Sequence, residues 1–136
     1  MAWVVDTSVL VDVYLADPQF AAASAQCLKN HLPDGLVVCP VSYVELFPAC
    51  RGKETVLQSF LQQLGVQGHE PWIWADTQKA GTLWNQHVIR KKKALTGKRP
   101  LGDVLIGAYA YRFQGLITRN QVDFRNLCPG LTLVSP

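Results

Sequence analysis

The chain begins with the stretch MAWVVDTSVL, residues 1–10, in which a short apolar run ends at Asp6 and two hydroxyl residues follow. The run from Ala2 to Val5 contains β-branched residues and stops at a polar turn, which predicts a buried strand. Asp6 then stands at the carboxyl end of that strand, the edge where open α/β sheets bind their ligands. Asp, Ser and Thr are also preferred helix N-caps. This stretch alone therefore does not decide whether Asp6 binds a ligand or caps the helix that follows.

Further short apolar runs alternate with helical patterns along the rest of the chain. Strands are predicted at residues 36–39, 116–118 and 131–134, with a weaker candidate at Pro71–Trp74. Helices are predicted at residues 8–16, 19–31, 42–50, 54–64, 77–92 and 101–114, with Asp76 and Gly115 as caps of the last two. This alternation favours right-handed crossovers, and therefore a three-layer α/β/α sandwich around a mostly parallel sheet of four to five strands.

The composition is that of a folded chain with a well-formed core. Hydrophobic residues make up 49% of the 136 residues and charged residues 17%, which argues against disorder and predicts one domain over residues 1–136. No apolar run approaches the about 20 residues that a membrane span needs, and residues 1–10 lack the basic segment of a signal peptide. We therefore expect a cytoplasmic protein with no membrane association.

The four cysteines are scattered, and none forms a C-x-x-C pair or lies near a histidine at zinc-ligand spacing. We expect them to be free, buried thiols that pack as small hydrophobic side chains. The four positions are Cys27, Cys39, Cys50 and Cys128.

Positive charge is concentrated in one part of the chain. The net charge is only +3, yet six cationic residues fall within ten positions: Arg90, Lys91, Lys92, Lys93, Lys98 and Arg99. Such a run is either a solvated face or an edge that neutralises nucleic-acid phosphates, and the run alone does not decide between them.

Four of the ten acidic residues occupy positions where structural explanations are weak. Asp6 ends the first strand, and Glu45 lies in the apolar helix that follows the second. Asp103 is in the first turn of the most apolar helix, and Asp123 follows the strand at 116–118. Because the carboxyl ends of parallel strands share one edge, we expect these four side chains to converge there. Each also has a local explanation, such as a helix-start charge for Asp103 or an Asx turn for Asp123.

A cluster of four carboxylates favours a bound cation. At about 4 Å each pair repels by roughly 1 to 4 kcal/mol, and a cation removes this repulsion. Oxygen ligands alone select a hard ion, which means Mg²⁺ or Mn²⁺. A hard divalent ion beside a basic edge points to phosphodiester hydrolysis, because the ion polarises the phosphate and generates a hydroxide nucleophile.

Four segments of the chain carry a family resemblance, and together they span most of its length. They are VVDTS at residues 4–8, SYVEL at 42–46, LGDVLIGA at 101–108 and LITRNQVDF at 116–124. With these motifs in this order, the chain resembles a PIN domain, specifically the VapC-type toxin ribonucleases of bacterial and archaeal toxin–antitoxin modules. It departs from the family in the weak strand signal at Pro71–Trp74.

The resemblance implies a magnesium site that cuts single-stranded RNA. The family's acidic positions fall on Asp6, Glu45, Asp103 and Asp123, of which Asp6, Asp103 and Asp123 are the expected metal ligands. It also implies a homodimer and a small antitoxin whose tail covers the acidic pocket. The expected supporting residues are Ser8, Thr118 and Asn120. The expected RNA-binding residues are Lys91, Lys92, Lys93, Lys98, Arg99 and Arg119.

Other functions are compatible with parts of this pattern. Phosphatases of the haloacid dehalogenase type also begin with a strand that ends in Asp, but they need a second Asp at the position of Ser8. A non-catalytic RNA- or antitoxin-binding module remains an alternative. A PIN nuclease that processes RNA outside a toxin system is another.

Overall fold

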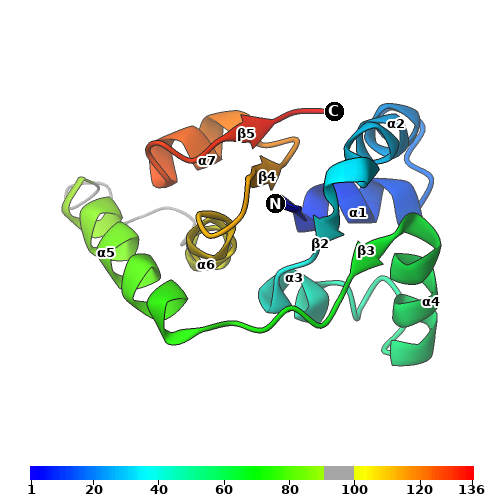
Figure 1. The fold of residues 1–136 in the computed structure, drawn as a ribbon, viewed down its shortest axis with the longest axis horizontal. Coiled ribbons are helices and arrows are strands. Elements are labelled where there is room, and N and C mark those ends of the chain that lie inside the picture. The colour runs from blue at the N-terminus through cyan, green and yellow to red at the C-terminus, as the bar shows by residue number, and fades with distance from the viewer. Residues whose placement is uncertain (91–99) are drawn as a thin grey trace.

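The computed structural model of the chain describes residues 1–90 and 100–136. Strands and helices alternate in it as the sequence predicts (Figure 1). The strands are β1 (Trp3–Val5), β2 (Leu36–Val37), β3 (Val66–Gln67), β4 (Gly115–Ile117) and β5 (Leu133–Val134). The helices are α1 (Thr7–Tyr14), α2 (Ala21–His31), η1 (Leu32–Asp34, a 3-10 turn), α3 (Pro40–Glu45), α4 (Glu54–Leu64), α5 (Trp74–Arg90), α6 (Leu101–Ala110) and α7 (Gln121–Leu127).

The five strands form one parallel sheet in the order β3-β2-β1-β4-β5. β1 lies in the middle, with Val4 beside Val37 of β2 on one side and beside Leu116 of β4 on the other. The chain moves outward from β1 through β2 and β3 and then crosses back to β4 and β5. The strand order therefore reverses between β1 and β4, and such a switch point opens a crevice at the carboxyl edge of a sheet.

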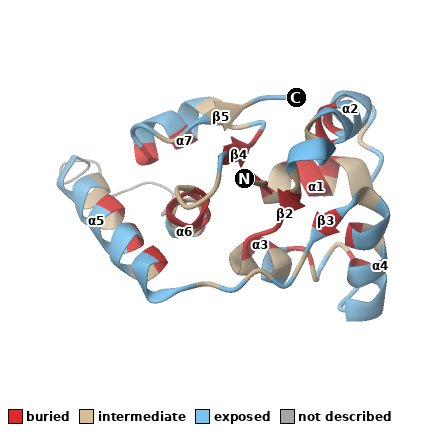
Figure 2. Ribbon diagram, in the orientation of Figure 1, coloured by how far each residue is buried: buried red, intermediate tan, exposed pale blue. Residues whose placement is uncertain are grey.

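Helices cover both faces of the sheet, which confirms the predicted three-layer α/β/α sandwich. Trp3 and Val5 of β1 pack in a core with α1, α2 and α4. Val4, whose side chain points to the opposite face, packs in a second core with α5, α6 and α7. Figure 2 shows the buried residues gathered on the central strands and on α6, the helix predicted to pack on more than one side.

The third strand is not where the sequence suggested. Pro71–Trp74 forms no strand: Trp74 begins α5, and β3 is Val66–Gln67, which pairs with β2. Asp76 is likewise not the N-cap residue of α5 but lies inside its first turn, where its carboxylate accepts the Ile73 N–H at 3.0 Å. The helix starts earlier than predicted because a first-turn carboxylate can satisfy the N–H of the residue that precedes the helix.

Gly115 was predicted as a helix C-cap, and the structure corrects this. α6 ends at Ala110, and Gly115 is the first residue of β4, paired with Trp3. A side chain at position 115 would collide with the Thr132 carbonyl oxygen and the Trp3 ring. Glycine is required here by close packing of β1, β4 and β5 and not by a left-handed backbone.

An ion pair with a buried carboxylate joins the first turn of α5 to the turn that follows α6. Asp76 is 1% exposed, and Arg112 donates hydrogen bonds to its two carboxylate oxygens at 2.7 and 2.8 Å. Arg112 also donates to the Pro71 carbonyl oxygen at 3.1 Å. Because the partners are 36 residues apart, the sequence pattern did not indicate this contact.

Two expectations from composition can be compared with the structure. All four cysteines are buried and free, as predicted. Within residues 1–90 and 100–136, no helix combines the length and the apolar character needed to cross a membrane.

Candidate active site

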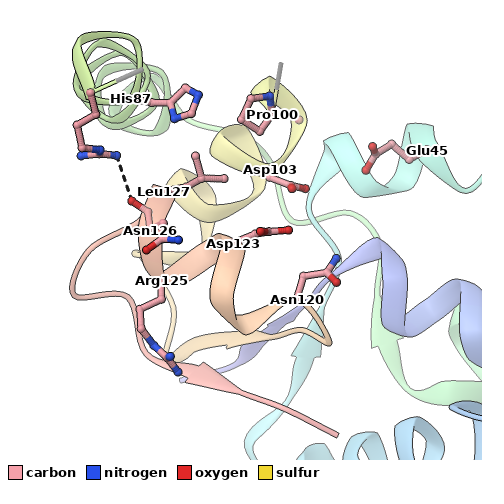
Figure 3. Close-up of a pocket in the computed structure, with 11 residues that line it drawn as sticks. Glu45, His87, Pro100, Asp103, Asn120, Asp123, Arg125, Asn126 and Leu127 are labelled. Carbon is pink, nitrogen blue, oxygen red and sulfur yellow. Dashed lines mark hydrogen bonds between the residues drawn. The ribbon is translucent and has the colours of Figure 1, made fainter. Parts of the chain in front are cut away.

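A pocket of about 920 Å³ opens where the N-terminal turns of α6 and α7 meet the end of α3 (Figure 3). In a parallel sheet with crossover helices, these helix starts lie at the carboxyl edge, so the pocket occupies the edge that the sequence predicted. Three of the four predicted acids line it. The lining residues are Glu45, His87, Arg90, Pro100, Gly102, Asp103, Asn120, Asp123, Arg125, Asn126 and Leu127.

Asp6, the fourth acid, is not among the lining residues and is 3% exposed. It stands at the N-cap position of α1, yet its side chain makes no capping hydrogen bond. Its Oδ2 instead accepts hydrogen bonds from the Thr118 hydroxyl at 2.7 Å and the Ser8 hydroxyl at 2.9 Å. The side chain of Asp6 is therefore oriented across the switch point toward β4, so Asp6 is the N-cap residue of α1 by position but does not cap the helix with its side chain.

Burial raises the pKa of Asp6 above its ordinary value of 3.8. The hydroxyls of Thr118 and Ser8 and the Thr7 N–H oppose this shift, because they donate to the charged form. The negative charge of Glu45 raises the pKa further, which places Glu45 within electrostatic reach of Asp6. Neutralisation of this carboxylate would therefore relieve both desolvation and repulsion.

Thr118 links the two strands beside the switch point. It is fully buried, directly after β4, and its hydroxyl donates to Asp6. The same hydroxyl oxygen accepts the Asn120 N–H at 3.0 Å, which fixes the turn that brings Asn120 into the pocket. The expected supporting residues Ser8 and Thr118 therefore contact Asp6, and Asn120 lines the pocket.

Glu45 is held at the pocket by the residue that follows Asp6. The Thr7 hydroxyl lies 2.7 Å from Glu45 Oε1 and 2.8 Å from Ser42 Oγ. A hydroxyl has one hydrogen, so Thr7 donates to the carboxylate and accepts from Ser42. A side-chain carbon at Gly102 would lie 3.6 Å from Glu45 Oε2, so the end of α3 and the first turn of α6 lie side by side.

Asp103 and Asp123 come from the first turns of α6 and α7. Figure 3 shows both carboxylates turned toward the side of the pocket on which Glu45 and Asn120 lie. Three of the four predicted acids therefore line one pocket at this edge of the sheet, and Asp6 is buried outside its lining. Asp123 and Glu45 are exposed, whereas Asp103 is half-buried.

The side of the pocket that carries the acids suits a hard cation, since its side-chain oxygens belong to the carboxylates of Glu45, Asp103 and Asp123 and to the amide of Asn120. The distances are longer than in a formed metal site: among residues 1–90 and 100–136, no three His, Cys, Asp or Glu side chains lie close enough to ligate one ion. The chemistry of the predicted ligands Asp6, Asp103 and Asp123 thus fits Mg²⁺ or Mn²⁺, although their side chains stand apart.

Arg119 was expected to bind RNA, but the structure gives it another contact. Its guanidinium donates to both carboxylate oxygens of Asp12, at 2.8 and 3.2 Å, and lies 4.2 Å from the centre of the Phe20 ring. Asp12 is 4% exposed. Arg119 is not among the pocket-lining residues, and we assign it to anchoring the turn after β4 on α1.

The remaining predicted RNA-binding residues, Lys91, Lys92, Lys93, Lys98 and Arg99, lie outside the described residues. The pocket contains other polar residues that the sequence did not single out: His87, Arg125 and Asn126. Arg90 also lines it and was noted only as part of the basic run. The LITRNQVDF motif stops one residue before Arg125, and no pattern linked α5 to α7.

Comparisons with known proteins bear on the fold. No protein-family profile matches the chain, and no curated protein sequence matches it. Among solved structures, the chain is similar to one described as the crystal structure of VapBC2 from Rickettsia felis bound to a DNA fragment from their promoter. The TM-score is 0.66 and the identity 19%, and the match covers 100% of this chain and 99% of that chain. At this identity the likeness shows a shared fold.

Proposed function

We propose that this chain is a metal-dependent endoribonuclease of the PIN type that cleaves single-stranded RNA. The observation that carries the proposal is the pocket at the carboxyl edge of the sheet. Glu45, Asp103 and Asp123 line it, and Asp6 is buried beside them with no arginine salt bridge among the described residues. A concentration of carboxylates of this kind favours a bound divalent cation, and such a cation can promote hydrolysis of a phosphodiester.

Asp6, Asp103 and Asp123 are the residues proposed to hold Mg²⁺ or Mn²⁺, with Glu45 as the fourth acid. A bound divalent cation supplies a Lewis acid that polarises the phosphate and lowers the pKa of a bound water. The protein's own contribution is orientation: the Ser8 and Thr118 hydroxyls aim Asp6, and the Thr7 hydroxyl aims Glu45. Asn120 places an amide in the same pocket, where it can hydrogen-bond a phosphate oxygen or an attacking water.

The direct test is cleavage of a labelled single-stranded RNA by the purified chain with Mg²⁺. Asp103→Asn and Asp123→Asn remove pocket carboxylates with little change in size, and each should lower the cleavage rate at least about 100-fold. Asp34→Asn is the matched control, because Asp34 is exposed in η1 and is not a pocket residue. Unchanged cleavage by the Asp103 and Asp123 variants would contradict the proposal.

A second candidate is a non-catalytic module that binds RNA or an antitoxin. It is favoured by the separation of the acids, because no three metal-binding side chains are clustered in the described parts of the chain. Calorimetry with Mn²⁺ separates the two candidates. Binding that is lost in Asp103→Asn supports the nuclease, whereas RNA binding without metal binding supports the module.

We further propose that the chain is the toxin of a VapBC-type toxin–antitoxin pair and acts in the cytoplasm. The four motifs support this, and so does the shared fold with a structure described as VapBC2. The partner would be a small antitoxin whose tail covers the acidic pocket. We expect expression of the chain to arrest growth. Co-expression of a small protein from the neighbouring reading frame should relieve the arrest. Growth unaffected by expression of an active chain would favour RNA processing outside a toxin system.

A homodimer is also part of the proposal, and an apolar groove of about 610 Å³ is its expected interface. The groove is formed by α3, α5 and α6 and includes Val44, 68% exposed, and Leu101, 46% exposed. We assign the groove to a second copy of the chain because the family resemblance implies a homodimer, and an exposed apolar surface of this kind marks a protein interface.

Light scattering of the purified chain tests the dimer. The wild type should have the mass of two chains, and Val44→Lys should have the mass of one, since a lysine in the groove would bury a charge. Val122→Lys is the matched control, because Val122 is 67% exposed on α7 and outside the groove. A monomeric wild type would contradict the homodimer.

A further inference from the structure

The candidate active site is a pocket with two chemically different sides. Figure 3 shows the carboxylates of Asp103 and Asp123 directed toward Glu45. His87 at the end of α5 and Arg125 at the end of α7 lie on the other side, apart from each other, and the Arg125 guanidinium is turned away from the two aspartates. Arg90 and Asn126 line the pocket with His87 and Arg125. One side therefore presents carboxylate oxygens, and the other presents N–H donors and positive charge.

The cationic side is built on two helix ends that are joined to each other. His87 and Arg90 are three residues apart in the last turn of α5, so they share one face of the helix. Arg90 Nη2 donates a hydrogen bond to the Asn126 carbonyl oxygen at 3.0 Å, drawn as the dashed line in Figure 3. This bond connects the end of α5 to the end of α7, which also carries Arg125. Arg90 therefore positions the two helix ends that line this side of the pocket.

His87 and Arg125 keep most of their hydrogen-bonding capacity. Within residues 1–90 and 100–136, the His87 ring has no hydrogen-bond partner and only a tilted contact with Trp84, at 5.7 Å between ring centres. Arg125 reaches Gln121 Oε1 through Nη2 at 3.4 Å, a long bond that leaves its other donors available. Arg119 and Arg112 differ from Arg125 because their guanidinium groups already donate to buried aspartates.

An RNA strand would match this division of charge. The scissile phosphate belongs at the carboxylate side, where the chemistry is proposed, and the backbone then continues toward the cationic side. At about 920 Å³ the pocket has room for more than the reacting phosphate. An arginine fork suits phosphate oxygens, and a histidine N–H donates to them whether or not the ring is charged.

We propose that His87 and Arg125, at two separate points on the cationic side of the pocket, form a second phosphate subsite that binds the RNA backbone next to the scissile phosphate. The proposal rests on the nuclease function above and adds residues that position the substrate without taking part in the chemical step. These two residues set where the strand crosses the pocket, and therefore which bond reaches the acids.

The test separates RNA binding from RNA cleavage. Binding of a fluorescent single-stranded oligoribonucleotide is measured by anisotropy in EDTA over a series of salt concentrations. Arg125→Ala should weaken binding about 10-fold and lower the salt slope by about one, and His87→Ala should weaken binding by a smaller factor. Arg125→Lys should keep the slope, because it keeps the charge. Lys29→Ala on α2, which removes an exposed charge outside the pocket, should bind as the wild type does.

Parallel cleavage and Mn²⁺ titrations identify which proposal fails. Both subsite variants should raise KM with little change in kcat and bind Mn²⁺ as the wild type does. Variants that bind and cleave RNA normally would overturn the subsite and leave the nuclease intact. A wild type that binds RNA without cleaving it would overturn the nuclease, whereas weaker binding by Arg125→Ala would still support the subsite. A wild type that binds no RNA would overturn both.

Discussion

Three aspartates are almost fully buried in the described parts of the chain, and they are held in two different ways. Asp12 and Asp76 are 4% and 1% exposed, and they bind Arg119 and Arg112. Asp6 is 3% exposed, and hydroxyls and a backbone N–H donate to it. Two of the buried charges are thus neutralised by arginines within the fold, and the third is only solvated by neutral donors.

The difference separates two carboxylates that are paired with a cation from one that is not. An arginine offsets the desolvation of a carboxylate and cross-links two segments, as in the Asp12 and Asp76 pairs. Hydroxyl donors orient Asp6 but leave its negative charge in place, and its pKa is raised by burial and by Glu45. A fold that holds an un-neutralised carboxylate beside other acids is suited to receive a cation.

The largest expected effect follows from replacement of Asp6. Asp6→Asn should lower the rate of RNA cleavage at least about 100-fold, because it removes a proposed metal ligand. At neutral pH its free energy of unfolding should equal or exceed that of the wild type, because a buried charge with a raised pKa has been removed. Cleavage assays and urea denaturation in EDTA measure the two effects. A strongly destabilised variant would place Asp6 with the structural aspartates.

The stability difference between Asp6→Asn and the wild type should change with pH in a definite direction. With a raised pKa, the folded protein binds the Asp6 proton more tightly than the unfolded chain does. The contribution of Asp6 to stability is therefore lost as the pH rises from the ordinary value of 3.8 through the raised pKa. The unfolding free energy of Asp6→Asn minus that of the wild type should increase from acidic to neutral pH. A decrease would contradict the raised pKa.

Loss of the Arg112–Asp76 ion pair should lower the stability of the protein and leave RNA cleavage unchanged, the opposite of what is expected for Asp6→Asn. Arg112→Ala leaves Asp76 buried without its cation and should lower the free energy of unfolding by about 3 kcal/mol. The double variant Asp76→Asn with Arg112→Met should recover part of this loss, because no unpaired charge remains. Urea denaturation measures both, and RNA cleavage by the folded fraction should be unchanged. Loss of cleavage without loss of stability would make this pair part of the site.

Loss of the Arg119–Asp12 ion pair should also lower stability without changing RNA affinity, but by less than loss of the Arg112–Asp76 pair. Its side chain is 35% exposed, so solvent already screens part of the pair, and Arg119→Ala should cost about 2 kcal/mol. Anisotropy with labelled RNA should show affinity close to that of the wild type. A large loss of RNA affinity in a stable variant would restore Arg119 to the RNA-binding set.

The smallest effect is expected from the hydroxyl that aims Asp6. Thr118→Val keeps the shape of the side chain but removes the donor to Asp6 and the acceptor for the Asn120 N–H. Mn²⁺ affinity measured by calorimetry should fall about 10-fold, as for other groups that orient a metal ligand. Thr132→Val, next to β5, is the matched control. An unchanged affinity would mean that burial alone orients Asp6.

The sequence by itself determined the alternation of strands and helices, and with it the edge at which the acids gather. Apolar runs and helical periodicity are local patterns, and the crossover rule converts their order into a parallel sheet. Asp6 and Asp123 could be chosen because they follow predicted strands, Glu45 because it lies in the apolar helix after the second strand, and Asp103 because it lies in the first turn of the most apolar helix. β2 and β5 fall within the strands predicted at 36–39 and 131–134, whereas the two-residue strand β3 was missed, since pairing with β2 defines it more than its own residues do.

Only the tertiary structure decided what each charged side chain contacts. Asp6 and Thr118 are 112 residues apart, and Arg119 and Asp12 are 107 residues apart. Local patterns left Asp6 open between a cap and a ligand, and they gave no sign that Arg119 pairs with Asp12. Packing decided which intramolecular partner each of them has, because burial makes a polar partner obligatory and only the folded chain brings one within reach.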